Sequence, residues 1–487
     1  MWKKFFLSTV GALAVCVSAA SAQTADELGI PGLEEVMEAG YAATFTCSGV
    51  FIAGRSPDQI NALELSAADG RPNFYTALLN SAPATIDIDY ERKIVSASFD
   101  DAAPPIRAAF RDGLGCSILP LGAGPDAAAA LPRLSKKRPH QDKSETAWPK
   151  RGPIQPASEA KPYQEGLDAV VERAFGREAY GVGSRTVSVL VVHKGEVVAE
   201  RYGRGFGPHT QYRTWSTAKS FANAVVGVAI EDGVLPDVSS PAPVPEWAKE
   251  GDKRQSITIE NLLHMASGLK TVVPRDGSNT PLAYTAGIDT ATDAASLSLI
   301  HEPGAKWHYS NYDTLLLLRS VKTALGDLQS YVDFPYERLF DRIGMHDTFA
   351  ETDPYGNYVM SSQVYTTARD LARFAYLYLN DGKWGRKRIL PEGWAQYSCT
   401  PITAEYRLPD HMRYGAQWWM YDLKFDESDG IENFRICSTN GARGQFAAFA
   451  PEHDLVIVRQ GVDEWGPDGF EEDIFFEDVV RAVAGRR

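Results

Sequence analysis

Two pairs of short apolar stretches, placed far apart in the chain, constrain its fold more than any other feature. Residues 186–192 and 196–202 flank a tight-turn sequence and favour a hairpin. Residues 445–450 and 455–460 form a second pair of the same kind. The long segment between the two hairpins carries mainly helical patterns. The sequence therefore predicts an α+β domain in which both ends build one antiparallel sheet and the middle inserts a helical subdomain.

Three helical patterns complete this domain. Apolar residues recur at helical spacing in residues 167–175, before the first hairpin, and residues 469–483 favour a helix near the end of the chain. Between the hairpins, residues 366–380 keep their apolar side chains on one face until Gly382 ends the pattern. We expect the first and last of these helices to cover the sheet.

The N-terminus reads as a secretory signal peptide over residues 1–22. A short basic start precedes an apolar run over residues 5–17, and Ala20-Ser21-Ala22 supplies a small-residue cleavage site. Lipidation at Cys16 is disfavoured, because the bulky Val15 precedes it. No later apolar stretch is long enough to span a membrane. We therefore expect a bacterial-type exported protein, periplasmic or extracellular.

Composition divides the rest of the chain into three parts. Residues 23–121 contain three stretches with strand-like character, 43–53, 85–99 and 106–121, which predict a small β-containing domain of unknown role. Residues 122–161 are rich in proline and favour a linker. Residues 162–487 form the α+β domain described above.

The charge of the chain narrows the choice of partners. The sequence has 49 basic and 63 acidic residues, for a net charge of −14. A protein this acidic has no electrostatic attraction for nucleic acid or for an anionic membrane surface. Keeping the protein soluble is a sufficient reason for this net charge. The sequence does not indicate the oligomeric state.

Four cysteines lie beyond the signal segment, at positions 47, 116, 399 and 437. Export would place them where disulfides persist. Four cysteines allow three pairings. Pairing Cys47 with Cys116 and Cys399 with Cys437 keeps each bridge inside one predicted domain, and four buried thiols are the alternative.

The sequence Ser216-Thr217-Ala218-Lys219 carries the strongest sign of chemistry. Serine needs a nearby base to act as a nucleophile, and a helix that begins at Ser216 would place the Lys219 amine one turn along the same face. The segment after Lys219 is apolar almost all round, which predicts a buried helix and a lysine pKa lowered by desolvation. The same spacing at Ser158 and Ser267 lacks this context.

Two further motifs supply candidate partners for Ser216. In Tyr309-Ser310-Asn311, Tyr309 is a candidate proton donor to a leaving group, and Asn311 a candidate ligand for the Lys219 amine or a substrate carbonyl. The segment 439–445 contains Gly441, Ala442 and Gln445 and leads into a predicted strand. Its glycines allow close backbone approach, and the Ala442 amide is a candidate oxyanion-hole donor beside that of Ser216.

Other classes of enzyme lack their signatures. Residues 203–207 are glycine-rich, but Pro208 and the absence of a following helix argue against dinucleotide binding. The sequence has no Gly-x-Ser-x-Gly elbow of an α/β-hydrolase. Its nine histidines show no zinc-binding spacing. The sequence therefore predicts neither a metal nor a cofactor.

In the order of its motifs, the chain resembles the β-lactamase-related serine hydrolases over residues 162–487. Ser-x-x-Lys, Tyr-x-Asn and a glycine-containing strand motif follow one another as in that family, and residues 257–268 and 367–372 are similar to its helical landmarks. The glycine-containing motif ends in Gly444-Gln445, which is similar to its ending in the branch of the family that contains 6-aminohexanoate-dimer hydrolase and esterases. The resemblance implies a β-lactamase/transpeptidase-like fold and a serine hydrolase with Ser216, Lys219 and Tyr309 as catalytic residues.

The substrate is less well determined than the nucleophile. Thr439 stands where β-lactam- or cell-wall-directed relatives usually place a lysine or histidine that holds a substrate carboxylate, and Arg443 is the nearest candidate to replace that cation. We therefore expect small or linear uncharged esters or amides as substrates. A β-lactamase or penicillin-binding protein, acylated with slow or no turnover, is the alternative.

Overall fold

The computed structural model describes residues 33–65, 85–98, 104–139, 152–270, 284–404, 408–464 and 468–484. The predicted signal segment lies outside these ranges. The chain forms two compact units, each built from separated segments. The first unit comprises Met1–Lys137, Pro236–Asp333 and Phe349–Gln363, and the second comprises Arg138–Leu235, Phe334–Thr348 and Val364–Arg487.

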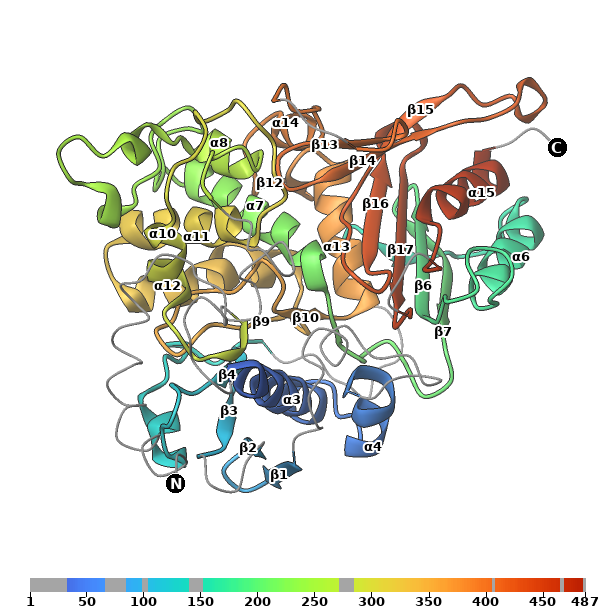
Figure 1. Cartoon of the computed structure of the whole chain (residues 1–487). Helices are drawn as coiled ribbons and strands as arrows, with labels where there is room; N and C mark the ends of the chain where they lie inside the picture. The colour runs from blue at the N-terminus through green and yellow to red at the C-terminus, as the bar shows by residue number, and fades with distance from the viewer. Residues whose placement is uncertain are drawn as a thin grey trace. The chain divides into compact units, whose positions relative to one another are not determined.

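The second unit contains an eight-stranded sheet, drawn in green and red in Figure 1. Its strands, in spatial order, are β13 (Met412–Tyr414), β14 (Trp419–Leu423), β15 (Phe434–Ser438), β16 (Phe446–Ala450), β17 (Leu455–Gly461), β6 (Thr186–His193), β7 (Glu196–Tyr202) and β5 (Gln155–Pro156). All neighbours are antiparallel except β5 and β7. Because β17 pairs with β6, the C-terminal and N-terminal hairpins form one sheet, which confirms the predicted architecture.

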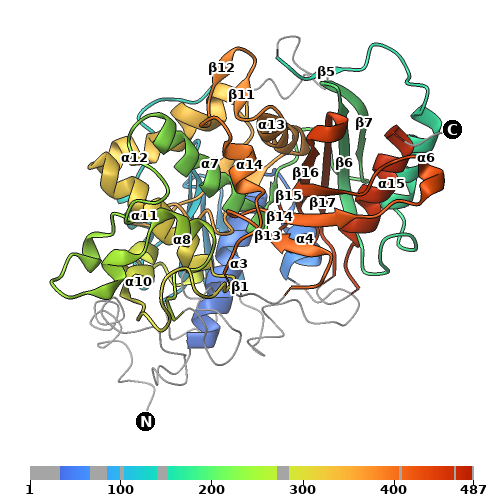
Figure 2. The same ribbon diagram turned by 90° about the horizontal axis from the view of Figure 1, so that it is seen from above.

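Helices cover both faces of this sheet (Figures 1 and 2). On one face, α6 (Gln164–Ala174) and α15 (Glu472–Ala484) bury a large apolar cluster with strand residues such as Ile457. On the other face lies α13 (Ala368–Leu379). These are the three helices that periodicity predicts. The unit also contains α7 (Ala218–Glu231), α14 (Trp394–Ser398), β8 (Tyr212–Arg213), β10 (Val364–Thr366), β11 (Lys383–Trp384) and β12 (Lys387–Arg388).

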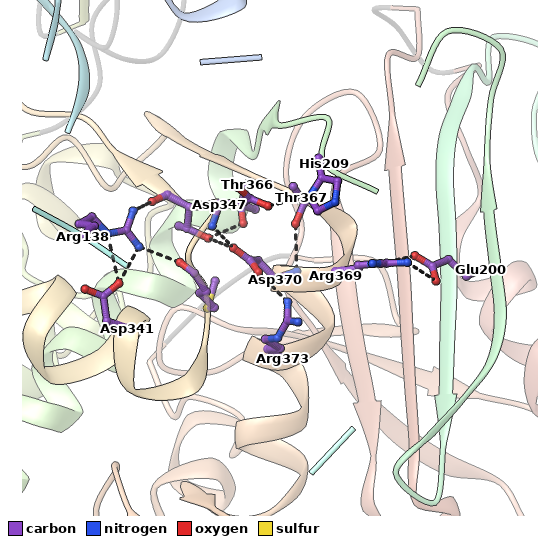
Figure 3. Close-up of polar contacts among 12 residues, drawn as sticks. Arg138, Glu200, His209, Asp341, Asp347, Thr366, Thr367, Arg369, Asp370 and Arg373 are labelled. Carbon is purple, nitrogen blue, oxygen red and sulfur yellow. Dashed lines mark hydrogen bonds and ion pairs between the residues drawn. The ribbon is translucent and has the colours of Figure 1, made fainter. Parts of the chain in front are cut away.

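The start of α13 is fixed by a buried polar network (Figure 3). Thr367 caps the helix by accepting a hydrogen bond from the Asp370 amide. The Asp370 carboxylate accepts hydrogen bonds from Thr348 Oγ1 at 2.9 Å and from Arg373 at 2.8 Å. Arg369 bonds Glu200 on β7 at 2.6 Å. The segment 367–372 thus ties the helix to the sheet.

The first unit begins with a small layered domain. Helix α3 (Leu33–Phe51) lies on a four-stranded antiparallel sheet, as Figure 1 shows in blue. Its strands are β1 (Thr85–Asp89), β2 (Ile94–Ser98), β3 (Ile106–Arg111) and β4 (Gly115–Ile118). The strand prediction for residues 43–53 is wrong. Ala39, Ala43 and Cys47 recur at helical spacing and pack on the sheet, so tertiary burial overrides the β-branched and aromatic composition.

Buried polar contacts join this small domain to the rest of the first unit. Glu351 accepts hydrogen bonds from Ser48 Oγ at 2.6 Å and from the Cys116 amide at 2.9 Å. Arg111 donates to Thr352 Oγ1 at 2.8 Å. Glu351 and Arg111 are both fully buried. Separating the two parts would leave these charges buried without partners, so the small domain is an integral part of the unit.

The remaining elements of the first unit are mainly helical. They are α4 (Pro57–Ile60), α8 (Ile259–Leu263), α10 (Thr290–Ser296), α11 (Asn311–Leu325), α12 (Leu328–Pro335, which continues past the unit boundary) and the short strand β9 (Phe349–Ala350). Part of the predicted linker is also built into this unit, where the Ser135 amide donates to Asp333 at 2.9 Å. Across the described ranges, no helix combines the length and apolar character needed to cross a bilayer.

Both predicted disulfides are present. Cys47 on α3 is bonded to Cys116 on β4 within the first unit. Cys399 is bonded to Cys437 on β15 within the second unit. Each bridge therefore stays inside one compact unit, as the positions of the cysteines predicted.

Candidate active site

Ser216 and Lys219 lie side by side in the second unit. Ser216 sits in the short turn Trp215–Thr217, and α7 begins directly after it. Lys219 Nζ donates a hydrogen bond to Ser216 Oγ over 3.2 Å. Ser216 is partly exposed, whereas Lys219 is 1% exposed. The spacing of three residues thus brings an accessible hydroxyl and a buried amine together, as predicted.

Burial sets the protonation of this lysine. Every residue of α7 from Ala218 to Ala229 is buried, so the helix has no solvent-facing side until its last turn. Desolvation holds the pKa of Lys219 well below its usual value. Removing an ammonium from water disfavours its charged form. Lys219 can therefore accept a proton from Ser216 in a pH range where an exposed lysine cannot.

The residue before the nucleophile has an unusual backbone. Trp215 has φ of 49°, in the left-handed region that a large side chain rarely occupies. The Arg213 guanidinium lies 4.3 Å from the centre of the Trp215 ring, a cation–π contact that helps hold this conformation. Strained residues of this kind cluster at functional sites. No pattern in the sequence predicted this backbone conformation.

The glycine-containing motif packs directly against the turn that carries Ser216. A Cβ at Gly441 would lie 2.1 Å from the Thr214 carbonyl oxygen and 3.1 Å from the Thr217 amide nitrogen. Thr217 Oγ1 donates to the Gln445 carbonyl oxygen at 2.8 Å and lies 3.0 Å from Thr439 Oγ1. Only glycine permits this approach of the two chains. The structure therefore brings Gly441 to Ser216, and the predicted oxyanion role of Ala442 stays a prediction.

Gln445 is a supporting residue in this arrangement. Its side chain is 1% exposed and donates to the Gly461 carbonyl oxygen and to that of Arg443. Its main chain closes the turn, because the Gly441 amide donates to the Gln445 carbonyl oxygen at 2.7 Å. A contact between Gln445 and substrate stays a prediction, and these bonds show that its amide serves the main chain.

Thr439 carries no charge, and the cation of this motif, Arg443, is bonded to main-chain oxygens. Thr439 is fully buried and accepts a hydrogen bond from the Ala447 amide at 2.9 Å. Arg443, with φ of 63°, donates to the carbonyl oxygens of Asp463 at 2.9 Å and Val462 at 3.0 Å. These bonds hold its guanidinium against the chain that follows β17.

A hydrogen-bonded triad of Asn440, Tyr421 and Glu472 was not predicted from the sequence. Asn440 Nδ2 donates to the Tyr421 hydroxyl and to Glu472 Oε1, each at 2.7 Å. Tyr421 OH also donates to Glu472 at 2.7 Å. Burial raises the pKa of Glu472 and of Tyr421. This triad links β14, the motif and α15, three segments with no local sequence signal for their contact.

Tyr309 and Asn311 belong to the first unit. Tyr309 is partly exposed, and its ring centre lies 6.3 Å from that of Trp307. Ser310 has an extended backbone and caps α11 by accepting from the Tyr312 and Asp313 amides. Asn311 is the first residue of α11 rather than part of an extended loop. The approach of Tyr309 and Asn311 to Ser216 stays a prediction.

The sheet flanked by helices, with a serine and a buried lysine at the start of one helix, defines a serine-hydrolase-like protein of the Ser-x-x-Lys class. The β-lactamase family model matches residues 171–460, and the chain belongs to this family. Its relatives include the 6-aminohexanoate-dimer hydrolase of Paenarthrobacter ureafaciens, 25% identical over 358 residues that span 67% of this chain and 86% of that protein.

Solved structures show the same fold. A candidate β-lactamase from Bacteroides dorei superimposes with a TM-score of 0.52 at 21% identity, over 66% of this chain and 98% of that one. A candidate 6-aminohexanoate-dimer hydrolase from Bacillus anthracis superimposes with a TM-score of 0.50 at 22% identity, over 66% of this chain and 81% of that one. Within the described residues, no cluster of three or more histidine, cysteine or acidic side chains is arranged to hold a metal ion.

Proposed function

We propose that the protein hydrolyses an ester or amide bond through an acyl-enzyme formed on Ser216. The observation that carries this proposal is the 3.2 Å contact between Ser216 Oγ and the buried amine of Lys219. A serine hydroxyl needs a base that is neutral near the working pH, and burial favours the neutral form of Lys219 because it lowers the pKa of this lysine.

The first half of the proposed reaction forms the acyl-enzyme. Ser216 Oγ attacks the substrate carbonyl carbon and gives its proton to Lys219 Nζ. The Ser216 and Ala442 amides stabilise the oxyanion of the tetrahedral intermediate. When the scissile bond breaks, Tyr309 donates a proton to the leaving alcohol or amine, and Asn311 holds the lysine or the substrate carbonyl.

The second half reverses these roles with water as the nucleophile. Water attacks the acyl carbon and gives one proton to the Tyr309 phenolate, because Lys219 already holds the proton from Ser216. The acid is released when the bond to Ser216 Oγ breaks and Lys219 returns that proton to Ser216. Ser216 recovers its proton and Tyr309 is restored to its protonated form. No atom or electron is required from outside the substrate and water.

Small or linear uncharged substrates fit this site better than carboxylate-bearing ones. A cation that binds a substrate carboxylate contributes about 1.5 to 3 kcal/mol. Thr439 is buried and uncharged, and the Arg443 guanidinium is bonded to main-chain carbonyls. The relative that acts on 6-aminohexanoate dimer, as its name states, supports the linear amide and not the absence of charge in this proposal.

Labelling with a fluorophosphonate tests the nucleophile. We expect the intact mass of the wild-type protein to increase by one adduct and that of Ser216→Ala to stay unchanged, because the variant lacks the attacking oxygen. Ser158→Ala is the matched control, since Ser158 has the same spacing to a lysine but lies outside the site. Equal labelling of Ser216→Ala and wild type would refute the assignment.

The substrate class is tested by comparing a short-chain nitrophenyl ester with a chromogenic cephalosporin on one preparation. We expect the ester to have the higher kcat/KM, because Thr439 supplies no cation to the cephalosporin carboxylate and the Arg443 guanidinium is already bonded to main-chain carbonyls. A cephalosporin preference of tenfold or more, about 1.4 kcal/mol, would favour a β-lactamase. An acyl adduct that persists for hours without turnover would favour a penicillin-binding role.

We also propose that the protein is exported to the periplasm or the cell exterior, with residues 1–22 as signal peptide. Two disulfides are compatible with an oxidising compartment. The division into residues 23–121, 122–161 and 162–487 remains our proposal for the sequence domains. The buried contacts of Glu351 support a structural role for the first of them.

A further inference from the structure

The disulfide between Cys399 and Cys437 is linked to both segments that meet at Ser216. Cys437 lies on β15, and Thr439 is two residues further along the chain. Thr439 Oγ1 lies 3.0 Å from Thr217 Oγ1, within hydrogen-bond distance. Because Thr217 directly follows Ser216, this half of the bridge is tied to the turn that carries the proposed nucleophile.

The other half of the bridge is tied to α7, the helix that carries Lys219. Cys399 directly follows Ser398, the last residue of α14. Ser398 Oγ lies 3.2 Å from Asn223 Nδ2 and 3.3 Å from Asn223 Oδ1. Asn223 is fully buried on α7, one turn after Lys219 and on the same side of the helix. Cys399 is therefore connected to the helix of the proposed base through one side-chain contact.

Asn223 also joins α7 to α13 and to the chain before β14. Its Oδ1 accepts from the Tyr378 hydroxyl on α13 and from Trp394 Nε1 on α14, the latter at 3.0 Å. Its Nδ2 donates to the Ala416 carbonyl oxygen at 2.8 Å. With Ser398, these partners use the full donor and acceptor capacity of a side-chain amide. A shift of α7 would leave buried polar groups without partners, which is costly, so Asn223 fixes the place of the helix.

These contacts form a closed ring inside the second unit. From Ser216 the ring runs through Thr217 and Thr439 to β15, across the disulfide to α14, and through Asn223 back to α7. The disulfide is a covalent link, whereas the other contacts between distant segments in this ring are hydrogen bonds. The bridge therefore limits how far the glycine-containing motif and the helix of Lys219 can separate.

We propose that the Cys399–Cys437 disulfide, with Asn223, is a positioning clamp for the Ser216 site, so that the hydrolase reaches full activity only while this bridge is oxidised. The clamp rests on the proposed acyl-enzyme function, because it acts on the distance between Ser216 and the amide donors of the glycine-containing motif. A displacement of about 1 Å at a reacting group costs on the order of 10²-fold in rate. The cytosol keeps thiols reduced, so the clamp would close after export to an oxidising compartment.

Exposure favours selective opening of this bridge. Cys399 is partly exposed, whereas Cys47 and Cys116 of the other bridge are 0% and 1% exposed. A thiolate of dithiothreitol attacks the Cys399 sulfur, forms a mixed disulfide and releases the Cys437 thiolate. The second thiol of the reagent then attacks its own sulfur in the mixed disulfide and releases Cys399. The reagent becomes a cyclic disulfide, and the electron pair and protons that it loses leave both cysteines as thiols.

Reduction of the folded full chain tests the clamp directly. The protein is treated with dithiothreitol without denaturant, the reagent is removed, and free thiols are mapped by alkylation and mass spectrometry. We expect free thiols at Cys399 and Cys437. The kcat for a nitrophenyl ester and the rate of fluorophosphonate labelling at Ser216 should each fall by about tenfold or more, with little change in KM. Circular dichroism should stay native, and reoxidation should restore both rates.

Variants locate the effect in the ring. Cys399→Ser/Cys437→Ser should reproduce the fall in kcat and should not respond to dithiothreitol. Cys47→Ser/Cys116→Ser is the matched control, because it removes the bridge of the first unit: it should lower stability and keep the wild-type kcat. Asn223→Ala should also lower kcat, and reduction should then lower it further by a smaller factor than in wild type, because both changes open the same ring.

The outcomes separate the clamp from the proposed function. Equal kcat and equal labelling rates before and after reduction, with free thiols mapped at Cys399 and Cys437, would overturn the clamp and leave the acyl-enzyme intact. A fall in kcat that accompanies loss of the native circular dichroism, or an equal fall in Cys47→Ser/Cys116→Ser, would also overturn it, since the bridge would then support folding in general. Activity that survives in Ser216→Ala would instead refute the acyl-enzyme itself.

Discussion

Different kinds of contact hold the segment around Ser216 and the segment around Tyr309 in place. Ser216 is held by close main-chain packing, with Gly441 against Thr214 and a lysine that is almost fully buried. Tyr309 lies between a helix cap and a cavity whose mouth carries exposed side chains. Burial shifts the pKa of a titratable group in each segment, since it lowers the pKa of Lys219 and raises that of Asp313.

We infer from this difference that the segment around Ser216 determines the rate of the reaction and that the segment around Tyr309 determines which substrates are preferred. A close-packed segment tolerates few substitutions, because small displacements there move the reacting atoms. An open cavity accepts changes at its mouth with little cost to folding. We therefore expect substitutions near Ser216 to lower turnover for every substrate and substitutions near the cavity to change the relative rates of different substrates.

The largest expected effect comes from Lys219→Met, which removes the base and keeps an apolar chain of similar length. We expect kcat for a nitrophenyl ester to fall by about 10³-fold, within the usual range for a general base. Wild-type kcat/KM should rise with pH as Lys219 loses its proton, with a midpoint well below the usual lysine pKa. The residual activity of the variant should lack this rise.

Measuring the stability of Lys219→Met distinguishes loss of the catalytic base from misfolding of the variant. The unfolded chain binds a proton at Lys219 more readily than the folded protein, because burial lowers the pKa of Lys219 in the folded state. Wild-type stability therefore increases with pH between the folded and the unfolded pKa of this lysine. Lys219→Met should therefore unfold at a higher denaturant concentration than wild type at neutral pH. Lys161→Met, at the same spacing from Ser158, is the control. Retention of more than a tenth of the activity by Lys219→Met would rule out its role as base.

Local patterns in the sequence predicted the elements that depend on neighbouring residues. The two hairpins, the helices near residues 170, 370 and 475 and the buried lysine of α7 follow from periodicity and composition. Contacts between distant segments had no such signal. Thr217 and Thr439 are 222 residues apart, and Ser267 and Asp313 are 46 apart. Helix α3 was mistaken for a strand because its packing on β1 to β4, rather than its composition, decides its structure.

A smaller effect is expected from Gly441→Ala, which tests the close packing itself. The added methyl group would lie 2.1 Å from the Thr214 carbonyl oxygen, so the turn with Ser216 or the glycine-containing motif must shift. Displacement of a reacting group by about 1 Å costs on the order of 10²-fold in rate. We expect kcat to fall by that factor for the ester and for any amide substrate. Gly166→Ala is the control, because a Cβ there meets no atom within 4 Å. The opposite outcome is that Gly441→Ala alters the ratio of rates between substrates and leaves kcat for the ester unchanged. The segment around Ser216 would then also select substrates, and the contrast between the two segments would be wrong.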